Sequence, residues 1–132
     1  MTRTRLALLA IFVLGACSSA PEPRETPQQV VERFLQAAMS RDRFVAITCA
    51  AQGEPRPDGT KTDKREKAIA PLLVATIFEH ARGARLTVVD SQRSGATAVV
   101  TYETRPYQGG RPQRHRAHLE TRGDTWKIVL LR

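Results

Sequence analysis

The spacing of apolar side chains changes once along this chain, from a helical period to an alternating one. Between residues 26 and 80 apolar residues recur every three or four positions, and from residue 85 they alternate with polar residues. Thr26, Pro27 and Gln29 form a helix start with a capping box, and an apolar face follows them. This pattern predicts a first helix from residue 26 and a short second helix over residues 43–51.

A third helix is predicted over residues 68–80, after a loop over residues 52–62 that is rich in proline and glycine. Asp63 is followed three residues later by Glu66, which is a second capping signal. Pro71 lies inside the apolar run, and proline lacks the backbone N–H that a helix interior needs. The segment therefore either restarts or kinks at this residue.

The alternating part of the chain predicts four β-strands. They cover residues 85–91, 97–103, 114–121 and 125–131, and glycine-containing turns separate them. Strands joined in succession by turns form an antiparallel meander. Because the helices precede the strands, we expect an α+β domain with N-terminal helices packed on one face of a curved four-stranded antiparallel sheet.

The first sixteen residues have the layout of an export signal. Arg3 and Arg5 precede an apolar run of nine residues over 6–14. A membrane-spanning helix needs about 20 apolar residues, so this run is too short to be an anchor. The proline-bearing segment that follows has no apolar period and predicts a flexible tether.

The end of this signal, Leu14-Gly15-Ala16-Cys17, resembles the bacterial lipobox. The resemblance implies that residues 1–16 are removed and that Cys17 carries a diacylglyceryl group as the first residue of the mature protein. The residue after the cysteine is Ser18, and in this the chain resembles lipoproteins that are sorted to the outer membrane. The resemblance implies attachment to that membrane, facing the periplasm. The expected organisation is a signal peptide (1–16), a tether (17–25) and one domain (26–132).

The formal net charge of +8 is unevenly distributed. Residues 82–132 contain ten Lys and Arg against four Asp and Glu, whereas residues 17–81 contain nine of each kind. Such a surface attracts anionic lipid head groups, acidic polymers or acidic envelope proteins. Nucleic acid is not expected, because an exported protein rarely meets it.

Candidate anion-binding residues follow from the strand pattern. Arg114, Arg116 and His118 share one strand face, and Arg105 and Arg111 support them from the adjoining turn. Arginine is the preferred side chain for phosphate and carboxylate groups. The alternative interpretation is an ordinary solvated sheet face.

Two segments of the domain resemble nuclear transport factor 2-like domains. They are Thr-Pro-Gln-Gln-Val-Val-Glu-Arg-Phe-Leu at residues 26–35, with the short helix at 41–44, and the hairpin over 119–128 that ends in Trp-Lys-Ile. Small bacterial lipoproteins of unknown function share this layout. The resemblance implies a cystatin-like cone and brings no catalytic motif with it.

A second hypothesis places a pocket inside that cone. Asp90, Tyr102 and His115 are predicted to share the apolar faces of their strands. Isomerases of the superfamily that this chain resembles use an acid and hydroxyl groups in such a pocket. The resemblance therefore implies that a buried Asp with a raised pKa acts as a base there. The alternative is that these three side chains lie at strand ends in water.

Neither a metal nor a cofactor is predicted. His115 and His118 are three positions apart on a strand and therefore point to opposite faces. Cys49 lies among apolar neighbours and is expected to be a buried thiol. The sequence therefore favours a non-enzymatic, envelope-tethered binding or accessory domain, with a small-molecule-binding or isomerase-like enzyme as the alternative. It leaves the oligomeric state open.

Overall fold

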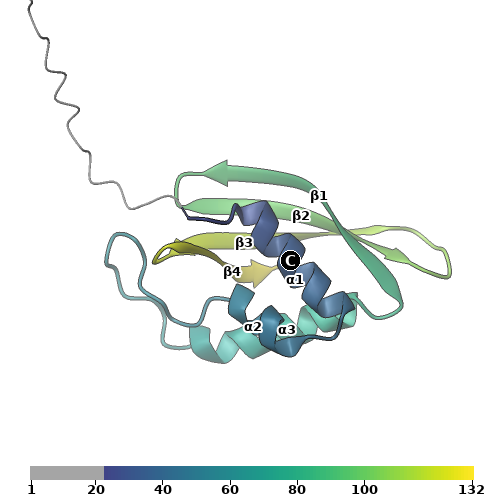
Figure 1. Cartoon of the computed structure of the whole chain (residues 1–132), viewed down its shortest axis with the longest axis horizontal. Helices are drawn as coiled ribbons and strands as arrows, with labels where there is room; N and C mark the ends of the chain where they lie inside the picture. The colour runs from purple at the N-terminus through teal and green to yellow at the C-terminus, as the bar shows by residue number, and fades with distance from the viewer. Residues whose placement is uncertain (1–22) are drawn as a thin grey trace, which may run out of the picture.

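The computed structural model describes residues 23–132, which form three helices followed by a four-stranded sheet (Figure 1). The strand order β1-β2-β3-β4 is that of an antiparallel meander, so the predicted fold class is confirmed. The helices all precede the strands and pack against one face of the sheet. The elements are α1 (Pro27–Met39), α2 (Arg43–Cys49), α3 (Glu66–His80), β1 (Ala84–Ser94), β2 (Thr97–Pro106), β3 (Gln113–Arg122) and β4 (Thr125–Leu131).

Helix α1 begins where the sequence predicts. The Gln29 backbone N–H donates to Thr26 Oγ1 at 3.1 Å, and the Thr26 N–H donates to Gln29 Oε1 at 2.9 Å. This reciprocal pair satisfies two donors that the first turn of a helix leaves free. The apolar side of α1, including Val31 and Phe34, is then fully buried against the sheet.

Helix α3 begins differently from the prediction. Asp63 Oδ1 accepts from the Arg65 N–H at 2.9 Å, but Arg65, not Asp63, is the residue before the helix, and its side chain forms no cap. The Glu66 carboxylate instead binds Arg122, at 2.6 and 2.9 Å. Pro71 lies within one continuous helix, so the segment does not restart there.

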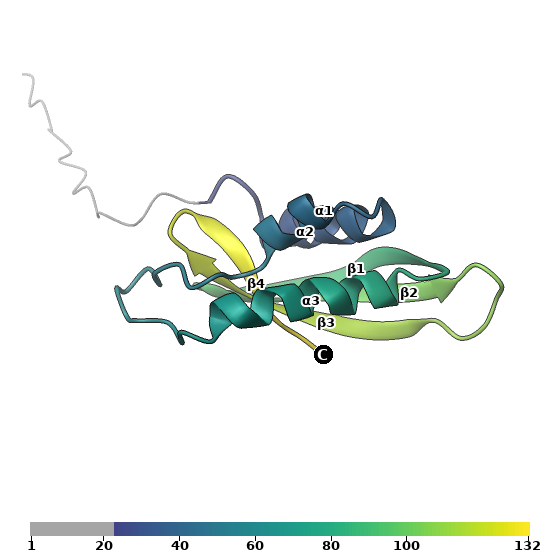
Figure 2. The same cartoon turned by 90° about the horizontal axis from the view of Figure 1, so that it is seen from below.

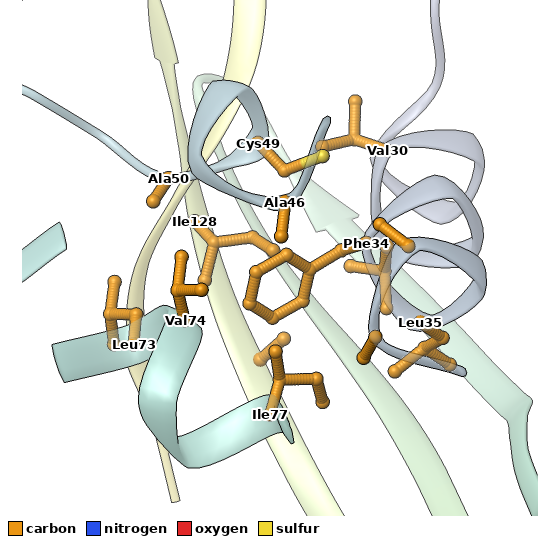
Figure 3. Close-up of a cluster of buried hydrophobic side chains, with 14 of the residues drawn as sticks. Val30, Phe34, Leu35, Ala46, Cys49, Ala50, Leu73, Val74, Ile77 and Ile128 are labelled. Carbon is orange, nitrogen blue, oxygen red and sulfur yellow. The ribbon is translucent and has the colours of Figure 1, made fainter. Parts of the chain in front are cut away.

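The core lies between the helices and the inner face of the sheet. Figure 3 shows the ring of Phe34 in the space between Val74, Ile77 and Ile128. Trp126 is 1% exposed, as expected for a core residue. Fully burying one such large side chain contributes about 1.5–3 kcal/mol, so this cluster holds the helices against the sheet.

Each of the two outer strand pairs contains a β-bulge. The β1–β2 register shifts between Val88 and Asp90, and the β3–β4 register shifts between His118 and Leu119. A bulge inserts one extra residue on one strand, bends that strand and changes which side chains share a face. The first of these shifts decides where Asp90 lies.

The signal peptide, the lipobox residues Leu14, Gly15 and Ala16, the lipidation site Cys17 and residues 18–22 of the tether lie outside the described residues. Within residues 23–132 no helix has the length and apolar character needed to cross a membrane.

Candidate functional site

The outer face of the sheet, which none of the described helices covers, gathers polar side chains from β1, β2 and β3 and from Arg132, which follows β4. Thr101 of β2 pairs with Arg116 of β3, and Asp90 of β1 pairs with Thr101. Directly paired residues of antiparallel strands point to the same face. Arg132 exchanges two backbone hydrogen bonds with Arg116, at 2.8 and 2.9 Å, and so adds a side chain beside β3.

These side chains surround one cleft with a volume of about 510 Å³. Its lining includes the cross-strand pair of Thr101 and Arg116, and three of its six residues are arginines. The lining residues are Asp90, Thr101, Arg114, Arg116, His118 and Arg132. The structure therefore brings together two of the predicted anion-binding arginines, together with His118, in one concave site.

The charges of the cleft are incompletely balanced. Arg114 Nε lies 4.0 Å from Glu103 Oε2, at the limit of an ion pair, and Arg105 Nε donates to the other oxygen of that carboxylate at 3.0 Å. Arg116 and Arg132 form no ion pair within residues 23–132. Asp90 is the carboxylate that lines the cleft, so the lining carries more positive than negative side chains.

His118 is a half-buried residue of the cleft lining. Burial is the largest cause that lowers its pKa, and the neighbouring Arg132 and Arg116 lower it further. The imidazole is therefore held neutral at neutral pH. Its Nε2 atom is buried and has no hydrogen-bond partner within the described part of the chain. Buried polar atoms are normally satisfied, so this unpaired nitrogen is an exception within residues 23–132.

The other two predicted arginines do not line the cleft. Arg105 lies near the end of β2 and pairs with Glu103. Arg111 lies exposed in the turn between β2 and β3. Thr101 and Arg132 line the cleft and were not predicted, because cross-strand register decides their positions.

Asp90 does not share a face with Tyr102 and His115, and this part of the pocket hypothesis is wrong. Tyr102 and His115 are paired on the inner face, where Tyr102 is fully buried. Simple alternation along β1 places Asp90 with Leu86 and Val88 on that face. The bulge after Val88 moves it to the outer face, where it is exposed.

On the inner face, His80 at the end of α3 takes the place beside Tyr102 that was predicted for Asp90. His80 Nδ1 and the Tyr102 hydroxyl share a hydrogen bond of 2.8 Å. The rings of His80 and His115 are stacked, with centroids 4.0 Å apart. His115 Nε2 also lies 3.5 Å from Thr104 Oγ1, at the limit of hydrogen bonding. This histidine–tyrosine cluster (His80, Tyr102 and His115) joins α3 to β2 and β3.

The cluster is uncharged at neutral pH. Burial lowers the pKa of both histidines, and the proximity of His115 lowers that of His80 further. Burial also raises the pKa of the Tyr102 hydroxyl well above its usual value of 10. Neutral imidazoles can accept a proton, so this cluster has the elements of a base and a hydrogen-bond donor.

Residues 23–132 contain no group of three or more His, Cys, Asp or Glu side chains placed to hold a metal ion. Cys49 is a fully buried free thiol whose pKa is raised by burial. A buried, protonated thiol is a poor nucleophile.

Several solved structures are similar to this chain in backbone. A candidate nuclear transport factor 2-like transpeptidase from Campylobacter jejuni is 12% identical, with a TM-score of 0.56, over 80% of this chain and 99% of that one. An uncharacterised cystatin-fold protein from Novosphingobium aromaticivorans is 14% identical, with a TM-score of 0.50, over 81% and 96%. The chain has a cystatin-like, nuclear transport factor 2-like fold.

A candidate ketosteroid isomerase from Shewanella frigidimarina is 15% identical, with a TM-score of 0.53, over 77% of this chain and 89% of that one. At such identities the similarity concerns the fold, which hosts both enzymes and non-enzymes. No protein-family model matches the chain, and a comparison with curated protein sequences finds no match either.

Proposed function

We propose that the protein is a membrane-anchored envelope lipoprotein whose domain is a non-enzymatic binding or accessory module. In this proposal the outer-face cleft recognises an anionic group of a lipid, a polymer or an envelope protein. The observation that carries it is the convergence of Arg114, Arg116 and Arg132 on one cleft, where Arg116 and Arg132 have no carboxylate partner among residues 23–132.

Binding through this cleft depends on geometry as well as on net charge. Arginine presents several N–H donors in a plane and suits phosphate and carboxylate oxygens. Thr101 and His118 add neutral hydrogen-bonding groups to the cleft. Because the arginines lie at an exposed face, the interaction is salt-dependent.

The experiment compares residues 23–132 with a double charge reversal, Arg114→Glu with Arg116→Glu. Each exposed basic residue near an anionic surface contributes about 1 kcal/mol, so reversing two weakens binding by at least about thirtyfold. Separate titrations with phosphatidylglycerol vesicles, polyphosphate and inorganic phosphate distinguish a lipid source from a soluble one. Added salt weakens the binding of the unchanged domain.

The matched control is Arg65→Glu with Arg82→Glu, which changes the net charge equally at exposed sites outside the cleft. We expect the control to bind nearly as the unchanged domain does. Equal weakening in both variants would mean that net charge, not the cleft, drives binding. An affinity that changes neither with salt nor in the cleft variant would mean that binding is not electrostatic.

The anchor is tested separately in the full chain. The resemblance of residues 14–17 to a lipobox supports the proposal that Cys17 is acylated, because several acyl chains give stable membrane attachment. Cys17→Ser is expected to leave an uncleaved precursor that takes up no labelled palmitate. Normal cleavage and labelling of the variant would contradict the lipoprotein assignment, whatever the cleft binds.

The histidine–tyrosine cluster supports a second candidate, an isomerase-like enzyme with a site in the cone. Shifting a double bond next to a carbonyl requires a base and a hydrogen-bond donor, and neutral His80 or His115 and Tyr102 offer both. A β,γ-unsaturated ketosteroid is the probe. Turnover by the domain that is lost in Tyr102→Phe would favour this candidate over the binding module.

A further inference from the structure

The charges of the outer-face cleft are arranged in order across the sheet. Asp90 of β1 pairs with Thr101 of β2, and Thr101 pairs with Arg116 of β3. Arg132 comes next, because it exchanges two backbone hydrogen bonds with Arg116. Side chains at directly paired positions lie next to each other on one face of a sheet. They therefore form a row, the cross-strand row, that runs from a carboxylate through a hydroxyl to two guanidinium groups.

The cross-strand row has a pole of each sign. Figure 2 shows the C-terminus, where Arg132 lies, beside β3 and away from α1 and α2. Arg114 lies two positions before Arg116 on β3, so it points to the same face and adds a third guanidinium group to the cationic pole. The anionic pole, Asp90, lies on β1, two strand spacings from β3, which is about 10 Å. The cleft therefore holds opposite charges a short distance apart.

The two poles do not neutralise each other. Within residues 23–132, Asp90 forms no ion pair, and Arg116 and Arg132 form none either. Glu103, which pairs with Arg114 on the same face, shows how a directly paired carboxylate lies in this sheet, because it contacts two arginines, at 3.0 and 4.0 Å. Asp90 is exposed and has no such contact. Its carboxylate is therefore available to a bound group.

A ligand that meets both poles carries both signs of charge. A purely anionic ligand pairs with the arginines but is repelled by Asp90. An ammonium group near the anionic group turns this repulsion into a second contact. Charged hydrogen bonds of about 3 Å at each end of a span of about 10 Å leave room for a link of only a few atoms. The ligand that fits is therefore a small zwitterion, or the zwitterionic end of a larger molecule.

The cationic pole favours phosphate over carboxylate as the anionic group. Three guanidinium groups converge there, those of Arg114, Arg116 and Arg132, and each carries several N–H donors in a plane. A carboxylate has two oxygens to accept these donors, whereas a phosphate monoester has three charged or partly charged oxygens. A phosphate therefore satisfies more of the pole.

The anionic pole favours a primary ammonium group. A primary ammonium donates N–H bonds, and the Asp90 carboxylate and the Thr101 hydroxyl oxygen both accept such bonds. A quaternary ammonium has no N–H and is normally held by aromatic rings. None of the lining residues, all of which lie within the described part of the chain, is Phe, Tyr or Trp.

We infer that the cleft binds a phosphoethanolamine group, with the phosphate among the arginines and the ammonium at Asp90. The inference rests on the proposed anion binding by the same cleft, and it names the ligand class. This group occurs as a lipid head group and as a small soluble molecule, and both present the same chemistry to the cleft.

Isothermal titration calorimetry of the full chain in a nonionic detergent tests the inference with three soluble probes. They are phosphoethanolamine, ethyl phosphate, which lacks the ammonium, and phosphocholine, which lacks the N–H donors. We expect phosphoethanolamine to bind at least about fivefold more tightly than either of the others. Ethyl phosphate has no positive charge to offset its phosphate, so attraction by net charge alone predicts the opposite order for that pair.

Substitution of Asp90 locates the ammonium group. Asp90→Asn is expected to weaken phosphoethanolamine binding about fivefold and to strengthen ethyl phosphate binding a few-fold, which removes the preference. Asp90→Glu keeps the charge and should keep most of the preference. The matched control is Asp124→Asn, which removes the same charge from an exposed residue outside the cleft and should bind as the unchanged chain does. Circular dichroism checks that every variant keeps its secondary structure.

A competition experiment distinguishes the two sources of the group. Phosphatidylethanolamine added to the detergent micelles should compete with soluble phosphoethanolamine if the cleft binds the lipid head group, and an equal amount of phosphatidylcholine should not. Binding of soluble phosphoethanolamine without competition by the lipid would assign the ligand to a soluble source. Either result supports the inferred chemistry.

Two results would overturn the inference and leave the proposed anion binding intact. One is equal binding of ethyl phosphate and phosphoethanolamine, with both weakened by Arg116→Glu. The other is a preference for phosphoethanolamine that Asp90→Asn does not change. If no probe binds, or if Arg116→Glu changes no affinity, the proposed anion binding fails together with the inference.

Discussion

The two faces of the sheet are built from neighbouring residues of the same strands, yet one face is packed against the helices and the other is solvated. On β2, Val100 and Tyr102 are fully buried against the helices, whereas Thr101 between them lines the cleft. On β3, Ala117 is buried between exposed Arg116 and half-buried His118. The inner face is therefore a packed apolar layer with one neutral polar cluster, and the outer face is a solvated and predominantly basic surface.

This difference shows what decides the role of a polar side chain in this fold. Asp90 and Tyr102 both lie on strands with an alternating pattern, but one bulge after Val88 places them on opposite faces. The outer position makes Asp90 a counter-charge among arginines. The inner position makes Tyr102 a hydrogen-bond partner for a histidine. Sheet register therefore places the cleft and the histidine–tyrosine cluster on opposite faces of the sheet.

The largest expected effect comes from placing the same charge on each face of β2. Val100→Asp buries a carboxylate without a partner and should destabilise the domain by more than about 4 kcal/mol. Thr101→Asp, one residue along, should change the free energy of unfolding by no more than about 1 kcal/mol. Urea unfolding of both variants measures the contrast. Similar losses in both would mean that the outer face is covered in solution.

Much of the fold could be predicted because its signals are local. The capping box at Thr26 and the helical spacing up to Ala38 depend on residues within a few positions of each other, and the structure has that helix. The alternation from residue 85 likewise predicted the strands. These patterns are created by the same short-range hydrogen bonds and periodicities that form the elements.

The parts that could not be predicted depend on contacts between distant segments. Arg122 was expected in a hairpin turn, but its side chain is 1% exposed and binds Glu66, which is 56 residues away, and also Glu120. His80 joins the interior cluster only because α3 ends over Tyr102. The bulge beside Asp90 is also a property of strand pairing. No local pattern contains this information.

The pH dependence of stability is expected to be intermediate in size and to differ between the faces. Because the folded pKa of His80 and of His115 lies below the ordinary value of 6.5, the unfolded chain binds more protons in the window below that value. The free energy of unfolding is therefore highest above about pH 6.5 and falls as the pH is lowered through the folded pKa values. Urea unfolding at a series of pH values measures this loss.

Replacing both inner histidines by glutamine should remove most of this pH dependence. The pKa of the outer-face His118 is lowered first by burial and further by Arg132 and Arg116, so only the part that these arginines contribute should shrink in high salt. The contribution of the inner pair comes first from burial and should persist in salt. A pH profile that is unchanged by the double replacement would contradict the assignment to the inner face.

The smallest expected effect concerns Asp90, whose position distinguishes the two faces most directly. Asp90→Asn removes the carboxylate that lines the cleft, and it leaves the inner face untouched. Removing one nearby negative charge should raise the affinity for an anionic probe by a few-fold, about 1 kcal/mol or less at an exposed site. The free energy of unfolding should stay within about 0.5 kcal/mol. Phosphate or polyphosphate titration at low salt measures the affinity. A loss of affinity would instead mean that Asp90 itself binds the ligand. A loss of stability would mean that Asp90 lies on the inner face, where simple alternation along β1 places it.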